Sequence, residues 1–201
     1  MTTRRGRPLD GQVALVTGGG KGIGRAIALA LAARGVRVIV TGRSERALGE
    51  VVGEIANAGA KARHLAGDVR DAAHLDAAIE RAVSVFGGID IVVANAGHPA
   101  PTFAAAARVM KGPGRLLLVA RSADVDPSVR DAARELAARR ITANAIFPEI
   151  APPGPGVLVL EPEDVAEVAV FLCTTAADPI TGQCIALSGM SGDATSPGGL
   201  M

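Results

Sequence analysis

Short apolar runs rich in β-branched residues alternate along this chain with longer segments in which apolar residues recur at helical spacing. Continuous apolar runs of this kind are typical of strands that are buried on both faces of a parallel sheet. Strands are expected over residues 12–17, 36–41, 62–66, 89–94, 115–120, 141–147 and 183–187. Helices are expected between them, including residues 23–33, 45–56, 72–85, 129–139 and 163–174.

The residues at the ends of the helical segments support these boundaries. Gly35, Gly59 and Gly87 stand where helices should stop, because glycine readily adopts the left-handed conformation that closes a helix. Ser44 and Asp71 stand where helices should start, since their side chains accept hydrogen bonds from the first free N–H groups.

Seven strands joined by right-handed helical crossovers predict an α/β fold. We expect one doubly wound, Rossmann-type domain over residues 1–201, with a mostly parallel sheet in the order 3-2-1-4-5-6-7 and helices on both faces. Residues 1–10 and 191–201 are expected to be mobile tails.

The composition and net charge of the chain argue against nucleic acid, membranes and metal ions as binding partners. The chain has 201 residues, 49% of them hydrophobic and 2% aromatic, with a net charge of +1. This charge gives no general attraction to nucleic acid or to an anionic membrane. The apolar runs are too short to span a bilayer, and we expect a cytoplasmic protein. Two cysteines and three histidines show no metal-ligand spacing, so no metal site is expected.

A glycine-rich turn joins the first expected strand to the first expected helix. Gly18 permits a sharp exit from the strand, Gly22 removes a side chain where a phosphate must approach, and Gly24 lets the helix pack on the sheet. Such a turn brings backbone N–H groups and a helix N-terminus to a pyrophosphate. The segment reads Thr17, Gly18, Gly19, Gly20, Lys21, Gly22, Ile23, Gly24.

The end of the second strand bears on the choice of dinucleotide. Proteins selective for NAD usually place an acid there to bind the ribose 2′-hydroxyl, whereas this chain has Gly42, Arg43 and Ser44. Arg43, together with Lys21 in the first turn, would attract a 2′-phosphate, which favours NADP(H) over NAD(H). The alternative is that Arg43 only solvates a surface loop.

These motifs resemble those of short-chain dehydrogenases/reductases, in particular of bacterial 3-oxoacyl-carrier-protein reductases. The matching pieces extend along the whole chain and include Gly67-Asp68-Val69, Asn95-Ala96-Gly97, Gly114-Arg115-Leu116-Leu117, Ile141-Thr142-Ala143-Asn144-Ala145 and Ile180-Thr181-Gly182-Gln183.

The resemblance also implies roles for single residues. Asp68 and Val69 would contact the adenine ring. Asn95, followed by Ala96 and Gly97, would stabilise the central sheet beside the coenzyme. The loop that contains Ile180 and Thr181 would lie near the nicotinamide end.

The proton-transfer pair that the resemblance implies is missing. In the family, a tyrosine and a lysine one helical turn apart protonate the product, and a serine after the fifth strand binds the carbonyl. This chain contains no tyrosine, and its last lysine is Lys111. The substitutes that we considered are Ser122, near the family's serine position, and His98, beside Gly97. A helix or turn cap for Ser122 and a solvated loop position for His98 are the alternatives.

The missing pair reflects a contraction. The stretch between Gly97 and Asn144 is about half as long as the family usually has, and the loop after the sixth strand lacks the usual helical lid over the substrate. Three functions stay open: an NADP(H)-dependent reductase of a small carbonyl substrate with weak or absent hydride transfer, a non-catalytic NADP(H) sensor or partner subunit, and a shortened relative with no selected activity. The resemblance implies a homodimer through residues 163–187.

Overall fold

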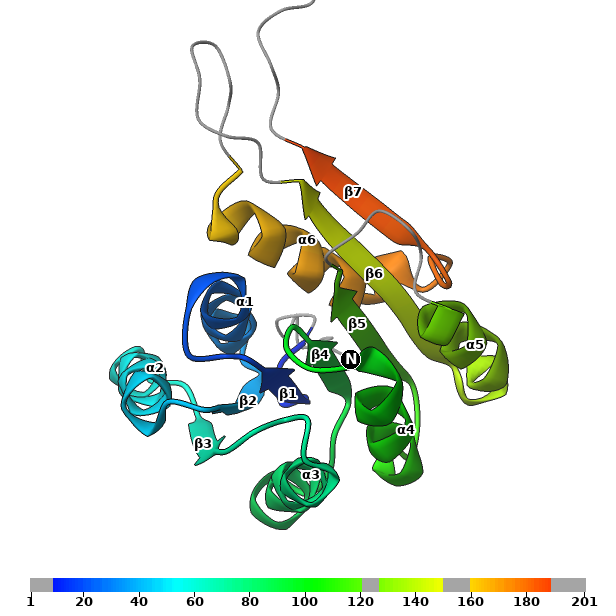
Figure 1. Cartoon of the computed structure of the whole chain (residues 1–201). Coiled ribbons are helices and arrows are strands. Elements are labelled where there is room, and N and C mark those ends of the chain that lie inside the picture. The colour runs from blue at the N-terminus through cyan, green and yellow to red at the C-terminus, as the bar shows by residue number, and fades with distance from the viewer. Residues whose placement is uncertain (1–8, 121–126, 150–159, 189–201) are drawn as a thin grey trace, which may run out of the picture.

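The computed structural model describes residues 9–120, 127–149 and 160–188. All seven strands form one sheet in the order β3-β2-β1-β4-β5-β6-β7, and every neighbouring pair is parallel (Figure 1). The strands are β1 Val13–Thr17, β2 Arg37–Gly42, β3 Ala62–Ala66, β4 Ile91–Ala94, β5 Gly114–Val119, β6 Ile141–Glu149 and β7 Cys184–Ser188. The expected topology is therefore confirmed.

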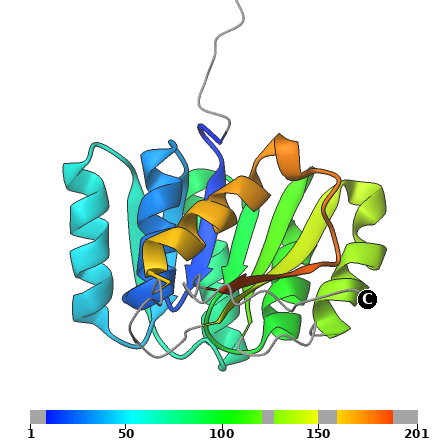
Figure 2. The same cartoon turned by 90° about the horizontal axis from the view of Figure 1, so that it is seen from above.

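In the described residues, six α-helices cover the two faces of the sheet. They are α1 Gly22–Ala33, α2 Glu45–Asn57, α3 Ala72–Phe86, α4 Pro99–Val109, α5 Pro127–Glu135 and α6 Pro162–Cys173. Helices α1, α2 and α6 pack on one face, and α3, α4 and α5 on the other (Figures 1 and 2). The side chains of β1 alternate accordingly, with Ala14 and Val16 in the first core and Val13 and Leu15 in the second.

Two parts of the helix pattern differ from the expectation. Helix α4 was not among the expected ranges, because its run of alanines gives little contrast between an apolar and a polar face. The expected helix over residues 129–139 ends earlier as an α-helix, at Glu135. A 3-10 turn, Ala137–Arg139, follows it, and Arg140 closes that turn in the left-handed conformation, at φ 58°.

Leu9, which was expected to belong to a mobile N-terminal tail, is packed in the core. Leu9 is only 1% exposed and belongs to the core that contains α1. Residues 1–8 and 189–201 lie outside the described part of the chain. Within the part that is described, no helix has the length and apolar character needed to cross a membrane.

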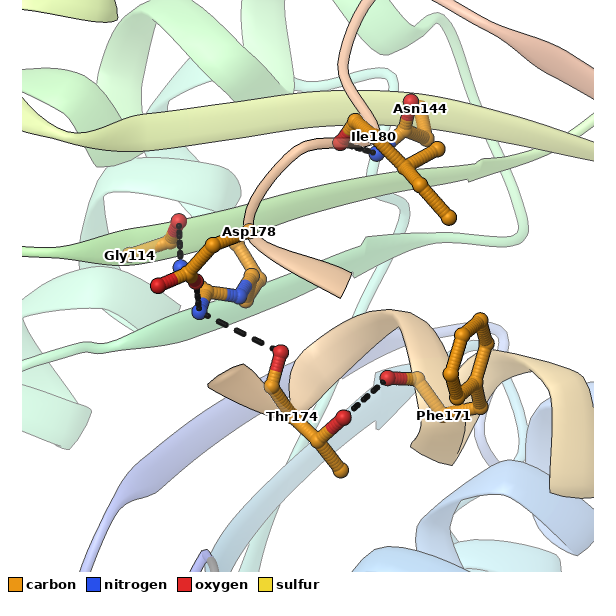
Figure 3. Close-up of polar contacts among 7 residues, drawn as sticks. Gly114, Asn144, Phe171, Thr174, Asp178 and Ile180 are labelled. Atoms are coloured by element: carbon orange, nitrogen blue, oxygen red, sulfur yellow. Dashed lines mark hydrogen bonds and ion pairs between the residues drawn. The ribbon is translucent and has the colours of Figure 1, made fainter. Parts of the chain in front are cut away.

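Two buried polar side chains fix the last third of the sheet (Figure 3). Arg115, on β5, donates to the carbonyl of Thr174 at 3.4 Å and forms an ion pair with Asp178, so β5 is tied to the chain beyond α6. Asn144, on β6, is fully buried. Its Nδ2 donates to Ile180 O at 2.8 Å, and its Oδ1 accepts from Gln183 N at 3.1 Å. The segment that leads into β7 is thereby bound to β6.

Candidate coenzyme site

The carboxyl ends of four neighbouring strands lie along one edge of the sheet. Thr17 of β1 is in register with Thr41 of β2 and with Ala94 of β4, and Thr41 is in register with Leu65 of β3. The loops that follow these strands therefore start side by side. In open α/β sheets this edge is where ligands bind.

The turn between β1 and α1 is locked against its neighbours. Gly18 N donates to Thr41 O at 2.7 Å. A Cβ on Gly18 would lie 2.7 Å from Asn95 Nδ2, and one on Gly24 would lie 2.6 Å from the same atom and collide with Gly18 O. Gly18 also has a positive φ of 67°. Packing thus leaves no room for a side chain at either glycine, and the positive φ of Gly18 fits the sharp exit from the strand that the sequence predicted.

The hydroxyl of Thr17 holds the loop after β4 in place. It accepts hydrogen bonds from Asn95 N at 3.1 Å and Ala96 N at 3.0 Å, and it donates to Ala96 O at 2.9 Å. Asn95 Nδ2 in turn donates to Gly18 O at 3.3 Å. Asn95 therefore ties the loop after β4 to the glycine-rich turn.

The start of α1 is open to an anion. A Cβ on Gly22 would meet no atom of the described residues within 4 Å, so none of these residues fills the space beside it. Lys21 occupies the N-cap position and makes no side-chain cap, and the first turn of α1 contains no acid. The helix N-terminus thus keeps its positive partial charge for a ligand. Of the other turn residues, Gly20 faces Ala47 and Ile23 packs on the core.

The loop after β2 carries the predicted selectivity residues. Gly42 ends the strand, and Ser44 caps α2 by accepting from Ala47 N at 3.3 Å. Arg43, between them, is exposed at the carboxyl edge of the sheet, whose loops after β1 to β4 we call the rim. Glu45, the first acid after this loop, pairs with His64 Nε2 at 2.6 Å.

Asp68 follows β3 and is paired with an arginine that the sequence reasoning missed. Arg70 donates from Nε to Asp68 Oδ1 at 3.0 Å and from Nη2 to Oδ2 at 2.5 Å. Hydrogen bonds from the side chain and the backbone of Arg70 hold the pKa of Asp68 well below its usual value, and the charge of Arg43 contributes in the same direction. The signal available in the sequence was an arginine two residues after an aspartate that ends a strand.

Two further contacts shape this end of the rim. A Cβ on Gly97 would lie 2.9 Å from Val69 Cγ2, so the loops after β3 and β4 touch through these residues. On the other side, His74 Nε2 lies 2.7 Å from Thr41 Oγ1, and the His74 ring occupies the space beside Gly67. Neither contact could be read from the sequence.

Of the two tentative catalytic residues, only His98 lies in the described part of the chain. His98 is exposed and stands at the N-cap position of α4, where its carbonyl accepts from Thr102 Oγ1 at 3.1 Å. Ser122 lies outside the described residues. A metal role finds no support in the part of the chain that is described, where no group of three or more suitable ligands occurs.

The expected position of Ile180 and Thr181, near the nicotinamide end, stays a prediction. Both residues precede β7, and Thr181 Oγ1 accepts from Ala143 N at 3.2 Å, in the first half of β6. The coenzyme edge is formed by residues that follow β1 to β4. Cys184, the first residue of β7, is level with Thr17 at the end of β1 through the register of β4, β5 and β6, so the segment before β7 approaches the same level of the sheet.

Comparisons with known proteins agree with this geometry. The family model of short chain dehydrogenases matches residues 12–111. A tetrahydroxynaphthalene reductase of Pestalotiopsis fici is 41% identical over 97 residues, which are 48% of this chain and 35% of that protein. Versicolorin reductase of Emericella nidulans is 48% identical over 90 residues, 44% of this chain and 34% of that protein. The matches thus span about a third of the length of these curated relatives.

Solved structures match over more of the chain. A hydroxysteroid dehydrogenase from Escherichia coli has a TM-score of 0.80 at 27% identity, and the match covers 91% of this chain and 97% of that one. A blue fluorescent protein from a metagenomic library, in complex with NADPH, has a TM-score of 0.81 at 27% identity and coverages of 90% and 98%. The finer resemblance to 3-oxoacyl-carrier-protein reductases stays a prediction. The chain belongs to the short-chain dehydrogenase/reductase family, a family of NAD(P)-binding oxidoreductases.

Proposed function

We propose that this protein binds NADP(H) at the carboxyl edge of β1 to β4 and that its hydride transfer to a carbonyl is weak or absent. The observation that carries the proposal is the open space beside Gly22. Gly18 and Gly24 are small because neighbouring atoms demand it, whereas Gly22 suits its positive φ of 54° and leaves the space at the start of α1 open. A pyrophosphate would fit in this space, against the N–H groups of the helix N-terminus.

The rim charges support NADP(H) over NAD(H). Arg43 stands after β2, where an NAD-selective protein would carry an acid, and Lys21 stands at the start of α1. An arginine fork suits a phosphate monoester in geometry as well as in charge. The carboxylate of Glu45, the next acid along the chain, pairs with His64.

The rest of the loops would hold the adenosine and the central part of the coenzyme. Asp68 accepts hydrogen bonds only, so it suits the exocyclic amine of adenine, and Val69 offers an apolar contact to the ring. Asn95, Ala96 and Gly97 stand beside the glycine-rich turn, on the path toward the nicotinamide.

Carbonyl reduction also requires a proton donor. The coenzyme supplies the hydride when bound, and the protein must supply the proton to the developing alkoxide. Residues 121–140, which join β5 to β6, include neither a tyrosine nor a lysine. His98 is the proposed proton donor and Ser122 the proposed hydrogen-bond donor to the carbonyl. Loss of general acid catalysis typically costs about 10²–10⁴-fold in rate.

A second function is a non-catalytic NADP(H)-binding sensor or partner subunit. It is favoured because the chain keeps the candidate coenzyme site but lacks the family's proton-transfer pair. The turn, the rim and the loop after β4 are in place, and the family's proton-transfer pair is absent from the sequence.

We propose a homodimer through α6 and β7. Phe171, on α6, is 45% exposed, and β7 is an edge strand of the sheet.

Fluorescence titrations with NADPH and NADH, paired with absorbance assays over ketones, diketones and 3-oxoacyl thioesters, test both functions. We expect micromolar or tighter NADPH binding, weaker NADH binding and very slow turnover. Robust turnover that collapses in His98→Ala or Ser122→Ala would establish the reductase and exclude the sensor. Failure of both coenzymes to bind would refute the proposed function.

A further inference from the structure

We propose that Arg70 is a specificity-determining residue for the 2′-phosphate of NADP(H). Its role would be to neutralise the carboxylate of Asp68, which otherwise lies beside the proposed phosphate position at Arg43. This inference rests on the proposed NADP(H) binding and adds a residue to it.

The contact between Arg70 and Asp68 is a fork. Nε of Arg70 lies 3.0 Å from Oδ1 and 3.1 Å from Oδ2 of Asp68, and Nη2 lies 2.5 Å from Oδ2. The backbone N–H of Arg70 also donates to Oδ1, at 3.0 Å. Both oxygens of the carboxylate are therefore bonded to Arg70, and the charge of Asp68 is compensated within its own loop.

The fork stands directly beside Arg43. Gly67 N donates to Gly42 O at 2.8 Å, so the ends of β2 and β3 are joined just before Arg43 and Asp68. Arg43 is near enough for its charge to lower the pKa of Asp68. Three charges thus share this stretch of the rim: two arginines and one aspartate.

This charge count affects the two coenzymes differently. The rim residues Arg43, Asp68 and Arg70 sum to one positive charge, and without Arg70 they sum to zero. A phosphate monoester carries about −1.5 to −2 charges near neutral pH. The loss of Arg70 would leave an uncompensated carboxylate that repels this phosphate. NAD(H) has a neutral hydroxyl at the same position, so its affinity should hardly depend on Arg70.

The surroundings of Arg70 make the substitution informative. Its side chain is 67% exposed, so replacing it removes no core packing. The hydrogen bond from its backbone N–H to Asp68 does not need the side chain, so the turn after β3 should persist. Arg108 offers a matched control, because it is also 67% exposed and pairs with an aspartate, Asp76, between α3 and α4.

Calorimetric titration of the whole chain with NADPH, NADH, adenosine 2′,5′-bisphosphate and AMP tests the inference in Arg70→Gln, Asp68→Asn and the double variant. We expect Arg70→Gln to weaken binding of NADPH and of the bisphosphate about 3- to 10-fold, with NADH and AMP changed less than about 2-fold. Arg70→Lys should restore much of the loss. The effect should shrink as ionic strength rises from about 0.05 M to about 0.5 M, because salt screens exposed charges.

The double variant separates charge compensation from direct binding. If Arg70 acts by neutralising Asp68, then Arg70→Gln should cost little once Asp68→Asn has removed the carboxylate. Arg108→Gln should leave all four affinities unchanged. An unchanged NADPH-to-NADH ratio in Arg70→Gln, or an equal loss in the presence and absence of Asp68, would overturn the inference while NADPH binding by the wild type stands. If the wild type binds no coenzyme, the proposed function fails first.

Discussion

The guanidinium of Arg115, on β5, forms an ion pair with Asp178, which lies beyond the end of α6. The arginine side chain is 7% exposed and the aspartate 42%, so one partner is buried and the other half-open to water. The arginine also donates to Gly114 O at 3.0 Å and to Thr174 O at 3.4 Å. The arginine therefore joins β5 to residues 174–178, two segments that are distant in sequence.

We expect Asp178→Ala to lower the free energy of unfolding by about 1–3 kcal/mol, since it leaves a buried guanidinium without its counter-charge. Urea unfolding measures the change. Asp76→Ala, which breaks the exposed pair with Arg108, serves as the control and should cost under about 1 kcal/mol. Equal losses of unfolding free energy in the two variants would show that the burial of Arg115 does not make its ion pair more important for stability.

Removal of the Thr17 hydroxyl should disturb both stability and coenzyme binding. Thr17→Val keeps the shape of the side chain but leaves Asn95 N and Ala96 N without their acceptor, at a cost of about 1–3 kcal/mol. Because these groups position the loop after β4, NADPH affinity should fall as well. Thr102→Val is the control, since it removes another buried hydroxyl that contacts only a helical carbonyl. A loss of stability in Thr17→Val without a change in NADPH affinity would contradict the positioning role.

Three glycines should respond differently to alanine. Gly24→Ala should destabilise the fold and abolish binding, because the new methyl group collides with Gly18 O and Asn95 Nδ2. Gly22→Ala should weaken NADPH binding with a stability cost of about 1 kcal/mol, since its φ is 54° and the space beside it is open. Thermal melts measure the stability of both variants, and titrations measure their NADPH affinity.

Gly53→Ala, on the exposed side of α2, is the control and should stabilise the protein by about 0.5–1 kcal/mol. NADPH binding by Gly22→Ala at the wild-type level would count against the phosphate position.

The carboxyl of Asp68 should titrate below its usual value of 3.8. A group whose pKa is lowered in the folded state stabilises that state above the unfolded-state pKa, and the contribution is lost as the pH falls through the folded-state value. An NMR titration in acid should therefore show a midpoint under 3.8 for the wild type. Arg70→Gln should move the midpoint back toward 3.8. An unchanged midpoint in this variant would mean that Arg70 does not bind the carboxylate of Asp68 in solution.

Most of the fold followed from the sequence because strands and helices differ clearly in their apolar spacing. The bounds of β3 were predicted to the residue, and those of the other strands to within two residues at either end. Helix α4 escaped notice because its first turn has two prolines and its middle has four consecutive alanines, Ala104 to Ala107. Its helical state depends on packing against α3 and α5, which local spacing does not reveal.

The candidate site was only partly readable. The glycine-rich turn could be interpreted because a glycine-rich segment between a strand and a helix is typical of a phosphate-binding turn. The pairing of Asp68 with Arg70 depends on the turn between them, and turn geometry cannot be derived from residue types alone. The role of Ile180 and Thr181 stays a prediction, because a motif match identifies a loop without giving its position relative to a ligand.

The interlocked packing of Gly18, Gly24 and Asn95 bears on how fast a dinucleotide is captured. A socket that is already shaped loses little entropy when a ligand arrives, since no loop has to be ordered first. We therefore expect association to be limited by encounter rather than by closure of the protein around its ligand, with differences in affinity expressed mainly as differences in residence time.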